Sequence, residues 1–191
     1  MTQAPEAAEV VSFWLAQTEK IWFSADPAFD AEVLSRFAEL VEQAKSGAFD
    51  HWAEGAEGAL ALVILLDQMT RNIYRDSPEM FAADGKALAV AKGAIERGFD
   101  ETLSTLKRRW LYMPFMHSED LADQERGIEL FAQSDISESL AFAVEHADII
   151  RRFGRFPHRN AILGRQTTPE EAAFLAGGGF SGVSPPVDRQ N

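Results

Sequence analysis

Apolar residues recur every three or four positions through most of this chain, which is the spacing of one face of an α-helix. In the segment 29–45, one such face holds Val33, Phe37, Leu40, Val41 and Ala44. Gly47 follows as a helix stop signal. No alternating pattern of comparable strength predicts a β-strand. We therefore expect an all-α protein with about seven to nine helices.

Capping and stop residues divide the remaining helical pattern into segments. A buried helix is predicted from near Ala56 through ALALVILL into DQMTRNIYR, because no turn signal comes before Ser77-Pro78. Ser77-Pro78-Glu79 has the features of a helix start, and Gly98 is the next stop signal. A further helix is predicted at about Leu103–Phe115, with Pro114 as its end or a kink. Another is predicted to begin after Ser118 as its cap, and a third to extend over Ser137–Phe153. A short last helix is predicted after the capping box at Thr168.

The length and composition favour one globular domain. The chain has 191 residues, of which 46% are hydrophobic, and this is enough to bury a sizeable core. We expect a single domain over residues 1–176 and a flexible glycine-rich tail over 177–191. The chain has no cysteine, which excludes disulfides, thiolate metal sites and cysteine nucleophiles.

The net charge and the hydropathy of the chain restrict the classes of partner that we expect it to bind. A net charge of −12 argues against broad nucleic-acid binding, which depends on many phosphate contacts. The longest apolar run, Ala59–Leu66, is too short to cross a membrane, and the N-terminal residues MTQAPEAAEV lack a secretory signal pattern. We expect a cytoplasmic protein that binds neither nucleic acid nor membranes.

The most unusual segment is 149–169, which has five arginines, one histidine and no acidic residue. Apolar side chains lie between the arginines. Guanidinium groups in such surroundings are expected near or inside the fold, where they need anionic partners. The partner is either another part of the chain or a bound ligand. Arg155, Arg159, Asn160 and Arg165 are therefore candidate anion-binding residues, and Arg71-Asn72 repeats the Arg-Asn pair of this segment.

Asp67, Arg71 and Arg75 are spaced four residues apart and share one helical face. The simpler interpretation is a ladder of ion pairs near a helix end. The functional interpretation is that Arg71 or Arg75 points into a cavity and binds an anion, with Asn72 orienting it. For the arginines of 149–169 the simpler alternative is pairing with acidic residues of the core, which include Asp67, Glu119, Asp120 and Glu145.

His117, Glu119 and Asp120 lie together at a predicted break between helices. An imidazole beside two carboxylates is a candidate general acid–base site or half of a metal site. The simpler alternative assigns the acids to helix capping and the histidine to packing. His158 is a second candidate catalytic histidine. His146 lies on an apolar helical face, where a histidine is more often a buried core residue than a ligand.

A metal site would need three of these histidines to converge with Glu119 or Asp120. No zinc-peptidase spacing is present, so no metal ligand is assigned and no cofactor is identified. The sequence also lacks a phosphate-binding loop, a dinucleotide fingerprint and a serine nucleophile flanked by glycines.

Four stretches resemble the bacterial family known as domain of unknown function 924: FWLAQTEKIWFSADPAFD, LLDQMTRNIYRDSPEMFAAD, YMPFMHSEDLADQE and HADIIRRFGRFPHRNAILGR. The resemblance extends from Val11 to Leu175. It departs at Met69-Thr70, where the family usually has Phe-Pro. The resemblance implies an all-helical fold similar to tetratricopeptide repeats, which are arrays of antiparallel helix pairs. It implies no activity, so no catalytic role is transferred.

Three functions are compatible with the sequence. The first is a pocket that binds a small anion through the arginines, with Asn72 and Asn160 orienting it and Trp14, Trp22 and Tyr112 as walls. The second is an adaptor that binds an acidic peptide on a repeat-like groove. The third is a hydrolase, with or without a metal, in which His117 or His158 is the base and Glu119 or Asp120 orients it. The sequence does not determine the oligomeric state.

Overall fold

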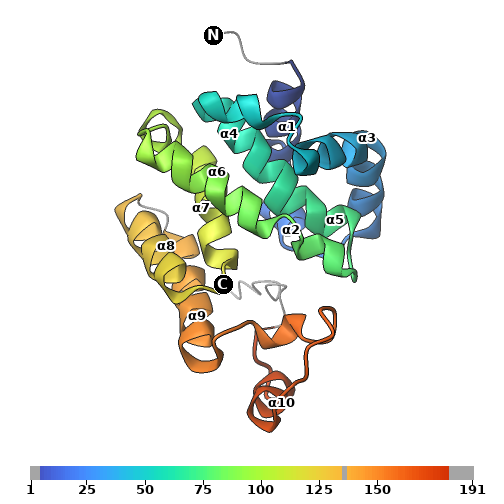
Figure 1. The fold of residues 1–191 in the computed structure, drawn as a ribbon, viewed down its shortest axis with the longest axis vertical. Coiled ribbons are helices and arrows are strands. Elements are labelled where there is room, and N and C mark those ends of the chain that lie inside the picture. Colours follow the sequence, from blue (N-terminus) through green and yellow to red (C-terminus); the bar gives the residue numbers. More distant parts are fainter. Residues whose placement is uncertain (1–4, 135–136, 181–191) are drawn as a thin grey trace, which may run out of the picture.

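The computed structural model describes residues 5–134 and 137–180, and all regular structure within these ranges is helical, as expected (Figure 1). The α-helices are α1 (Pro5–Leu15), α2 (Glu19–Trp22), α3 (Pro27–Ser46), α4 (Ala56–Val63), α5 (Thr70–Ile73), α6 (Asp84–Glu96), α7 (Thr105–His117), α8 (Leu121–Gln133), α9 (Ser137–Phe153) and α10 (Pro169–Ala176). Short 3-10 segments are Asp50–Glu54, Pro78–Phe81, Asp100–Thr102 and Pro157–Arg159.

Helices α4 and α5 are two ends of one continuous helix. They are joined by a π-helical segment, η2, at Ile64–Met69. The apolar run Ala59–Leu66 is buried on every side, which is why it has no amphipathic pattern. Helix α4 packs against α1, α6 and α7, while α3 covers η2 and α5. This continuous helix is therefore the centre of the N-terminal part of the molecule.

The C-terminal half is built around a sequential stack. Helix α7 packs on α8 and α8 on α9, and α10 contacts the 3-10 turn Pro157–Arg159 (Figure 1). A small apolar cluster of Ile149, Ile150 and Phe156 lies at this end. The all-α expectation is confirmed; the arrangement as a tetratricopeptide-like array remains a prediction.

Several helix ends differ from the sequence predictions. Ser77 does accept a hydrogen bond from the Glu79 amide, but the turn it caps ends at Phe81 and α6 begins only at Asp84. Helix α8 is capped by Asp120 rather than Ser118. Pro114 lies inside α7, which continues to His117.

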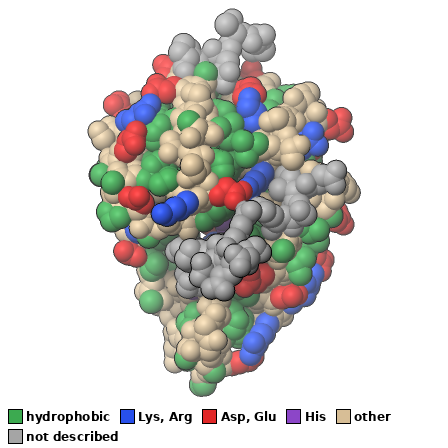
Figure 2. All heavy atoms as spheres, turned by 180° about the vertical axis from the view of Figure 1, so that it is seen from behind, with side chains coloured by type: hydrophobic (Ala, Val, Ile, Leu, Met, Phe, Trp, Pro, Cys, Tyr) green, Lys and Arg blue, Asp and Glu red, His purple; other side chains and the backbone are tan. Residues whose placement is uncertain are grey.

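The capping box predicted at Thr168 is present at the start of α10. Of the tail predicted for 177–191, residues 181–191 lie outside the described part of the chain. None of the described helices is long and apolar enough to cross a membrane. On the face shown in Figure 2, acidic and basic side chains are interspersed with hydrophobic ones.

Candidate functional site

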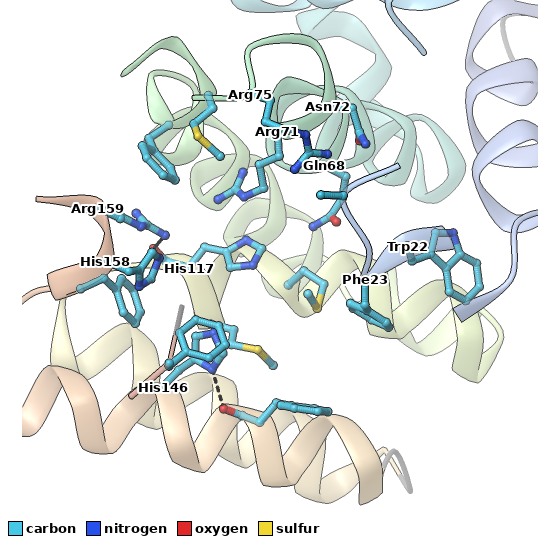
Figure 3. A pocket seen from close by; sticks show the side chains of 18 of the residues that line it. Trp22, Phe23, Gln68, Arg71, Asn72, Arg75, His117, His146, His158 and Arg159 are labelled. Carbon is cyan, nitrogen blue, oxygen red and sulfur yellow. Dashed lines mark hydrogen bonds between the residues drawn. The ribbon is translucent and has the colours of Figure 1, made fainter. Parts of the chain in front are cut away.

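A cavity of about 400 Å³ lies where the two halves of the molecule meet. Its lining comes from α1, the end of α2 and the following loop, η2 and α5, α7, α9 and the 3-10 turn Pro157–Arg159 (Figure 3). The polar lining includes Gln68, Arg71, Asn72, Arg75, Arg109, His117, Ser139, His146, His158 and Arg159. The apolar lining includes Trp14, Trp22, Phe23, Met80, Phe81, Met113, Met116, Phe142, Phe156, Ile162 and Phe180.

The π-helical segment η2 places Asp67 beneath the polar wall of this cavity. The Asp67 side chain is fully buried, and it accepts hydrogen bonds from His117 and Gln68. Arg71 Nη1 is 3.6 Å from Asp67 Oδ1. Burial alone would raise the pKa of Asp67, but the positive charges of His117 and Arg71, together with hydrogen bonds from His117 and Gln68, outweigh it and lower the pKa. Asp67 is thus a buried carboxylate ion, and π-helical turns are frequent at functional sites.

His117 is the last residue of α7, and its ring projects into the middle of the cavity (Figure 3). Its Nδ1 lies 2.7 Å from Asp67 Oδ1. Because a carboxylate ion only accepts hydrogen bonds, Nδ1 carries the proton in the neutral ring and Nε2 keeps its lone pair. The side chain is 14% exposed.

The backbone around His117 is held by two buried side chains. Gln124 Nε2 donates to the carbonyl oxygens of Met116 and Ser118, at 2.7 and 2.6 Å. Arg159 Nη2 donates to the carbonyl oxygen of His117 at 3.0 Å. The imidazole is therefore fixed through both its ring and its main chain.

Arg71 and Arg159 share one carboxylate, Asp84. Arg71 Nη2 lies 3.1 Å and Arg159 Nη1 3.2 Å from Asp84 Oδ2. The Arg159 guanidinium also lies over two aromatic rings, 4.4 Å from the centroid of Phe81 and 4.7 Å from that of Phe156. The aromatic contacts fix the plane of the guanidinium.

Arg159 is 7% exposed, and its Nε has no hydrogen-bond partner among the described residues. Burial lowers the pKa of Arg159 to about 10, although Asp84 acts in the opposite direction. The group is still a cation at neutral pH, and its Nε is enclosed by the surrounding protein atoms.

The other cationic groups of the cavity also form ion pairs with carboxylates. Arg75 binds Asp30 through Nε and Nη2 at 2.5 and 2.7 Å, and Asn72 donates to the same carboxylate at 2.8 Å. Burial opposes ionisation of Asp30, but the bonds from Arg75 and Asn72 lower its pKa overall. Arg109 pairs with Glu19 at 3.1 Å, and its buried Nε, like that of Arg159, has no hydrogen-bond partner among the described residues. This end of the cavity is held together mainly by internal ion pairs.

His146 and His158 lie on the wall next to His117 (Figure 3). His146 Nδ1 donates to the carbonyl oxygen of Phe142 at 2.7 Å. Burial lowers the pKa of both His146 and His158 to about 3, so both rings are neutral at neutral pH. Across residues 5–134 and 137–180, no three histidine or carboxylate side chains are placed to share a metal ion.

Several predicted site residues lie in a second network outside the cavity. Arg165 binds Glu119 through two nitrogens, at 2.7 and 3.0 Å, and Glu119 also accepts from the Phe156 amide. Arg155 and Asn160 bind Glu171, the capping residue of α10. Burial would raise the pKa of Glu119, but the hydrogen bonds from Arg165 and from the Phe156 amide lower it. This part of the arginine-rich segment attaches the C-terminal turns to the core.

The cavity therefore includes part of the predicted site. It brings together Arg71, Asn72, Arg75, Arg159, His117 and His158, with Asp67 behind them. Asp120 caps α8, and Glu119 is bound to Arg165, so neither orients His117. Trp14 and Trp22 line the cavity as expected; Tyr112 does not, and it donates to Asp100 at 2.7 Å.

Sequence reasoning missed Asp84, Arg109 and Phe81. Asp84 is an ordinary first-turn acid in the sequence, and only the tertiary structure brings two arginines to it. Arg109 lies in the amphipathic stretch TLKRRWLYM, where one arginine cannot be distinguished from its neighbours. Asp67 was noted, but its partner His117 is 50 residues away.

A second cavity of about 380 Å³ adjoins the first. It is lined by Pro78, Ala82, Asp84, Leu88, Pro114, Ser118, Glu119 and Leu163. Phe81, His117 and Arg159 line both cavities. These three residues therefore lie where the two cavities meet.

Comparison with known proteins places the chain in a family. Residues 10–179 match the model for bacterial proteins of unknown function DUF924. The chain belongs to this family. It is also similar to a solved structure of a protein of unknown function from Agrobacterium tumefaciens, with 44% identity and a TM-score of 0.87. That match covers 91% of this chain and 98% of the other. The comparison with curated proteins gives no match.

Proposed function

We propose that this DUF924 protein binds a small carboxylate with an aromatic or hydrocarbon body in the larger cavity. The observation that carries the proposal is the arrangement of Arg71 and Arg159. The two guanidinium groups line the cavity and share the single carboxylate of Asp84. A carboxylate bound in the cavity would face both cations, and hydrogen bonds between guanidinium groups and carboxylates are among the stronger ones.

The charge balance favours a single negative charge on the ligand. Arg71 and Arg159 face the carboxylates of Asp67 and Asp84, while Arg75 is neutralised by Asp30. A site whose charges are already nearly balanced accommodates a monoanion at a lower electrostatic cost than a dianion.

The remaining walls suit an apolar group. Trp22, Phe23, Phe81, Phe142 and Phe156 line the same cavity, together with methionines of α7. Small-molecule sites commonly combine an apolar lining with a few polar groups, in volumes of about 300–1,000 Å³. The cavity of about 400 Å³ lies at the lower end of that range. A ligand such as an aryl or medium-chain carboxylate fits this combination.

A peptide adaptor, the second function compatible with the sequence, would need a different kind of surface. An extended acidic peptide needs a groove along the surface, whereas the lining of this cavity includes the buried side chains of Met116, His146 and Arg159. A cavity that reaches such buried side chains favours a small ligand.

Isothermal titration calorimetry with four probes tests the proposal. Phenylacetate and octanoate carry both a carboxylate and an apolar body; acetate carries only the charge, and benzyl alcohol only the body. We expect phenylacetate or octanoate to bind at least tenfold more tightly than acetate and benzyl alcohol. The reason is that the carboxylate then contacts the arginines while the apolar body contacts the aromatic lining.

Variants at two arginines separate the cavity from the rest of the arginine-rich segment. Arg159→Lys keeps the charge but loses the planar donor group, and should weaken phenylacetate binding about tenfold, which corresponds to about 1.4 kcal/mol. Arg155→Lys is the control, since Arg155 binds Glu171 outside the cavity. Equal affinities in both variants, or no binding of either amphipathic carboxylate, would refute the proposal.

A further inference from the structure

We propose that the bound carboxylate is a reaction product, and that His117, oriented by Asp67, activates water to hydrolyse the corresponding carboxylic ester. This inference rests on the proposed function, because it assigns a reaction to the same cavity. It depends on three features: the His117–Asp67 pair, the cationic guanidinium of Arg159 beside it, and the position of both groups in the lining of two cavities.

The first feature is a histidine whose free nitrogen faces the cavity. With Nδ1–H donated to Asp67 Oδ1 at 2.7 Å, the Nε2 lone pair is available to accept a proton. The Asp67 carboxylate favours the positively charged imidazolium that forms when it does. The buried bonds from Gln124 and Arg159 to the backbone at 116–118 keep the ring in this orientation.

The second feature is a donor for the negative charge that develops on the carbonyl oxygen. The cationic guanidinium of Arg159 lines both cavities, and its Nη2 bonds to the main chain of His117 itself. A fixed cationic donor beside the base stabilises the tetrahedral intermediate of acyl transfer. The same donor then binds the carboxylate that is formed.

The third feature is the place where the two cavities meet. An ester has two halves, and His117 and Arg159 line both the larger and the smaller cavity. The acyl body fits the aromatic walls of the larger one. The alcohol fits the smaller one, whose lining includes Leu88, Pro114 and Leu163. The scissile bond then lies beside His117.

The reaction needs only water as co-reactant. The water oxygen forms a bond to the carbonyl carbon while one water proton moves to His117 Nε2. The carbon–oxygen bond to the alcohol then breaks, and the proton on Nε2 moves to the departing alkoxide. An alcohol and a carboxylic acid result; the acid ionises, its proton enters the solvent, and Nε2 is again free.

The test uses 4-nitrophenyl phenylacetate and 4-nitrophenyl octanoate as substrates, with release of 4-nitrophenolate followed at constant pH. We expect turnover by the wild-type protein and competitive inhibition by phenylacetate at its dissociation constant. His117→Gln should lower kcat at least 100-fold while phenylacetate still binds. His51→Gln, at an exposed position outside both cavities, should leave kcat unchanged.

Two further variants separate catalysis from folding. Asp67→Asn should lower kcat with little change in KM, because Asp67 is a positioning residue that does not touch substrate. Leu163→Trp fills the smaller cavity, and should slow hydrolysis of both esters at least tenfold while leaving phenylacetate binding unchanged. A purely structural role for the pair would not produce this split between binding and turnover.

The outcomes distinguish the two proposals. Phenylacetate binding without ester turnover above the buffer rate, or with the same turnover in His117→Gln, overturns the hydrolase inference and leaves the proposed binding function intact. Absence of both binding and turnover overturns both.

Discussion

Asp67 and His117 are joined across 50 residues of sequence by a 2.7 Å hydrogen bond, which links the central helix to the end of α7. The carboxylate is fully buried, and the imidazole is 14% exposed toward the cavity. The bond therefore connects the most buried charge of the N-terminal half with the wall of the candidate site. It contributes both to folding and to the geometry of the cavity.

Removing Asp67 should strongly destabilise the protein. In Asp67→Ala, Arg71 loses one buried anionic partner and His117 loses its acceptor. Breaking a buried pair in this way typically costs about 3–5 kcal/mol of the free energy of unfolding. Urea denaturation followed by circular dichroism measures the difference. Asp148→Ala is the matched control, since Asp148 pairs with Arg151 at the surface with 66% exposure, and should cost less than about 1 kcal/mol. Equal costs for the two variants would contradict this account.

Arg165→Ala should loosen the C-terminal turns without unfolding the core. Arg165 holds Glu119 through two nitrogens and also donates to the Phe156 carbonyl. Its loss removes one attachment of the segment after α9, while Arg159 still binds Asp84 and the carbonyl oxygen of His117. We expect faster amide hydrogen exchange in residues 155–176 and unchanged exchange in α4. Arg152→Ala is the control: it removes an exposed ion pair with Glu170 and should leave both amide exchange rates unchanged. Faster exchange throughout the molecule would show that the attachment is part of the cooperative core.

The helices could be predicted because each one buries a periodic apolar face, and this is a local property of the sequence. Their ends were less predictable because tertiary contacts choose among nearby capping residues. At the start of α8, Glu119 is bound to Arg165 and the Phe156 amide, so the chain before Asp120 is extended and Asp120 becomes the cap. Nothing near Ser118 in the sequence indicates this.

The candidate site could be predicted only as a set of residues. Charge patterning singled out the arginines and His117, but which arginines face the cavity depends on the position of their acidic partners. Arg155 and Arg165 are neutralised by Glu171 and Glu119, whereas Arg159 shares Asp84 with Arg71. These pairings join segments up to 75 residues apart, beyond the range of any periodicity.

Two glycines in helices should respond to alanine in opposite ways. A Cβ at Gly58 would lie 2.2 Å from the carbonyl oxygen of Trp52, so Gly58→Ala must push the 3-10 turn away from α4. A cost of about 2 kcal/mol or more is expected, as for overpacked cores. At Gly93 in α6, a Cβ would meet only the end of Arg97 at 3.7 Å, so Gly93→Ala should stabilise the protein by about 0.5–1 kcal/mol through helix propensity. Urea denaturation of both variants gives the two signs, and a stabilised Gly58→Ala would show that the close approach of Trp52 is absent in solution.

Mild acid should destabilise the protein through its buried histidines. Burial, followed by the nearby positive groups, lowers the pKa of His146 and of His158 from 6.5 to about 3. Between those values the unfolded chain binds a proton at each histidine and the folded protein does not, so the free energy of unfolding is at its full value above pH 6.5 and falls as the pH drops below it. Each group contributes a slope of about 1.4 kcal/mol per pH unit. Urea denaturation between pH 7 and 5 measures the total slope, and His146→Leu should reduce it by about one group's share while the exposed His51→Gln leaves it unchanged. An unchanged slope in His146→Leu would mean that His146 is protonated in the folded protein, and that the cavity wall is open to water at this position.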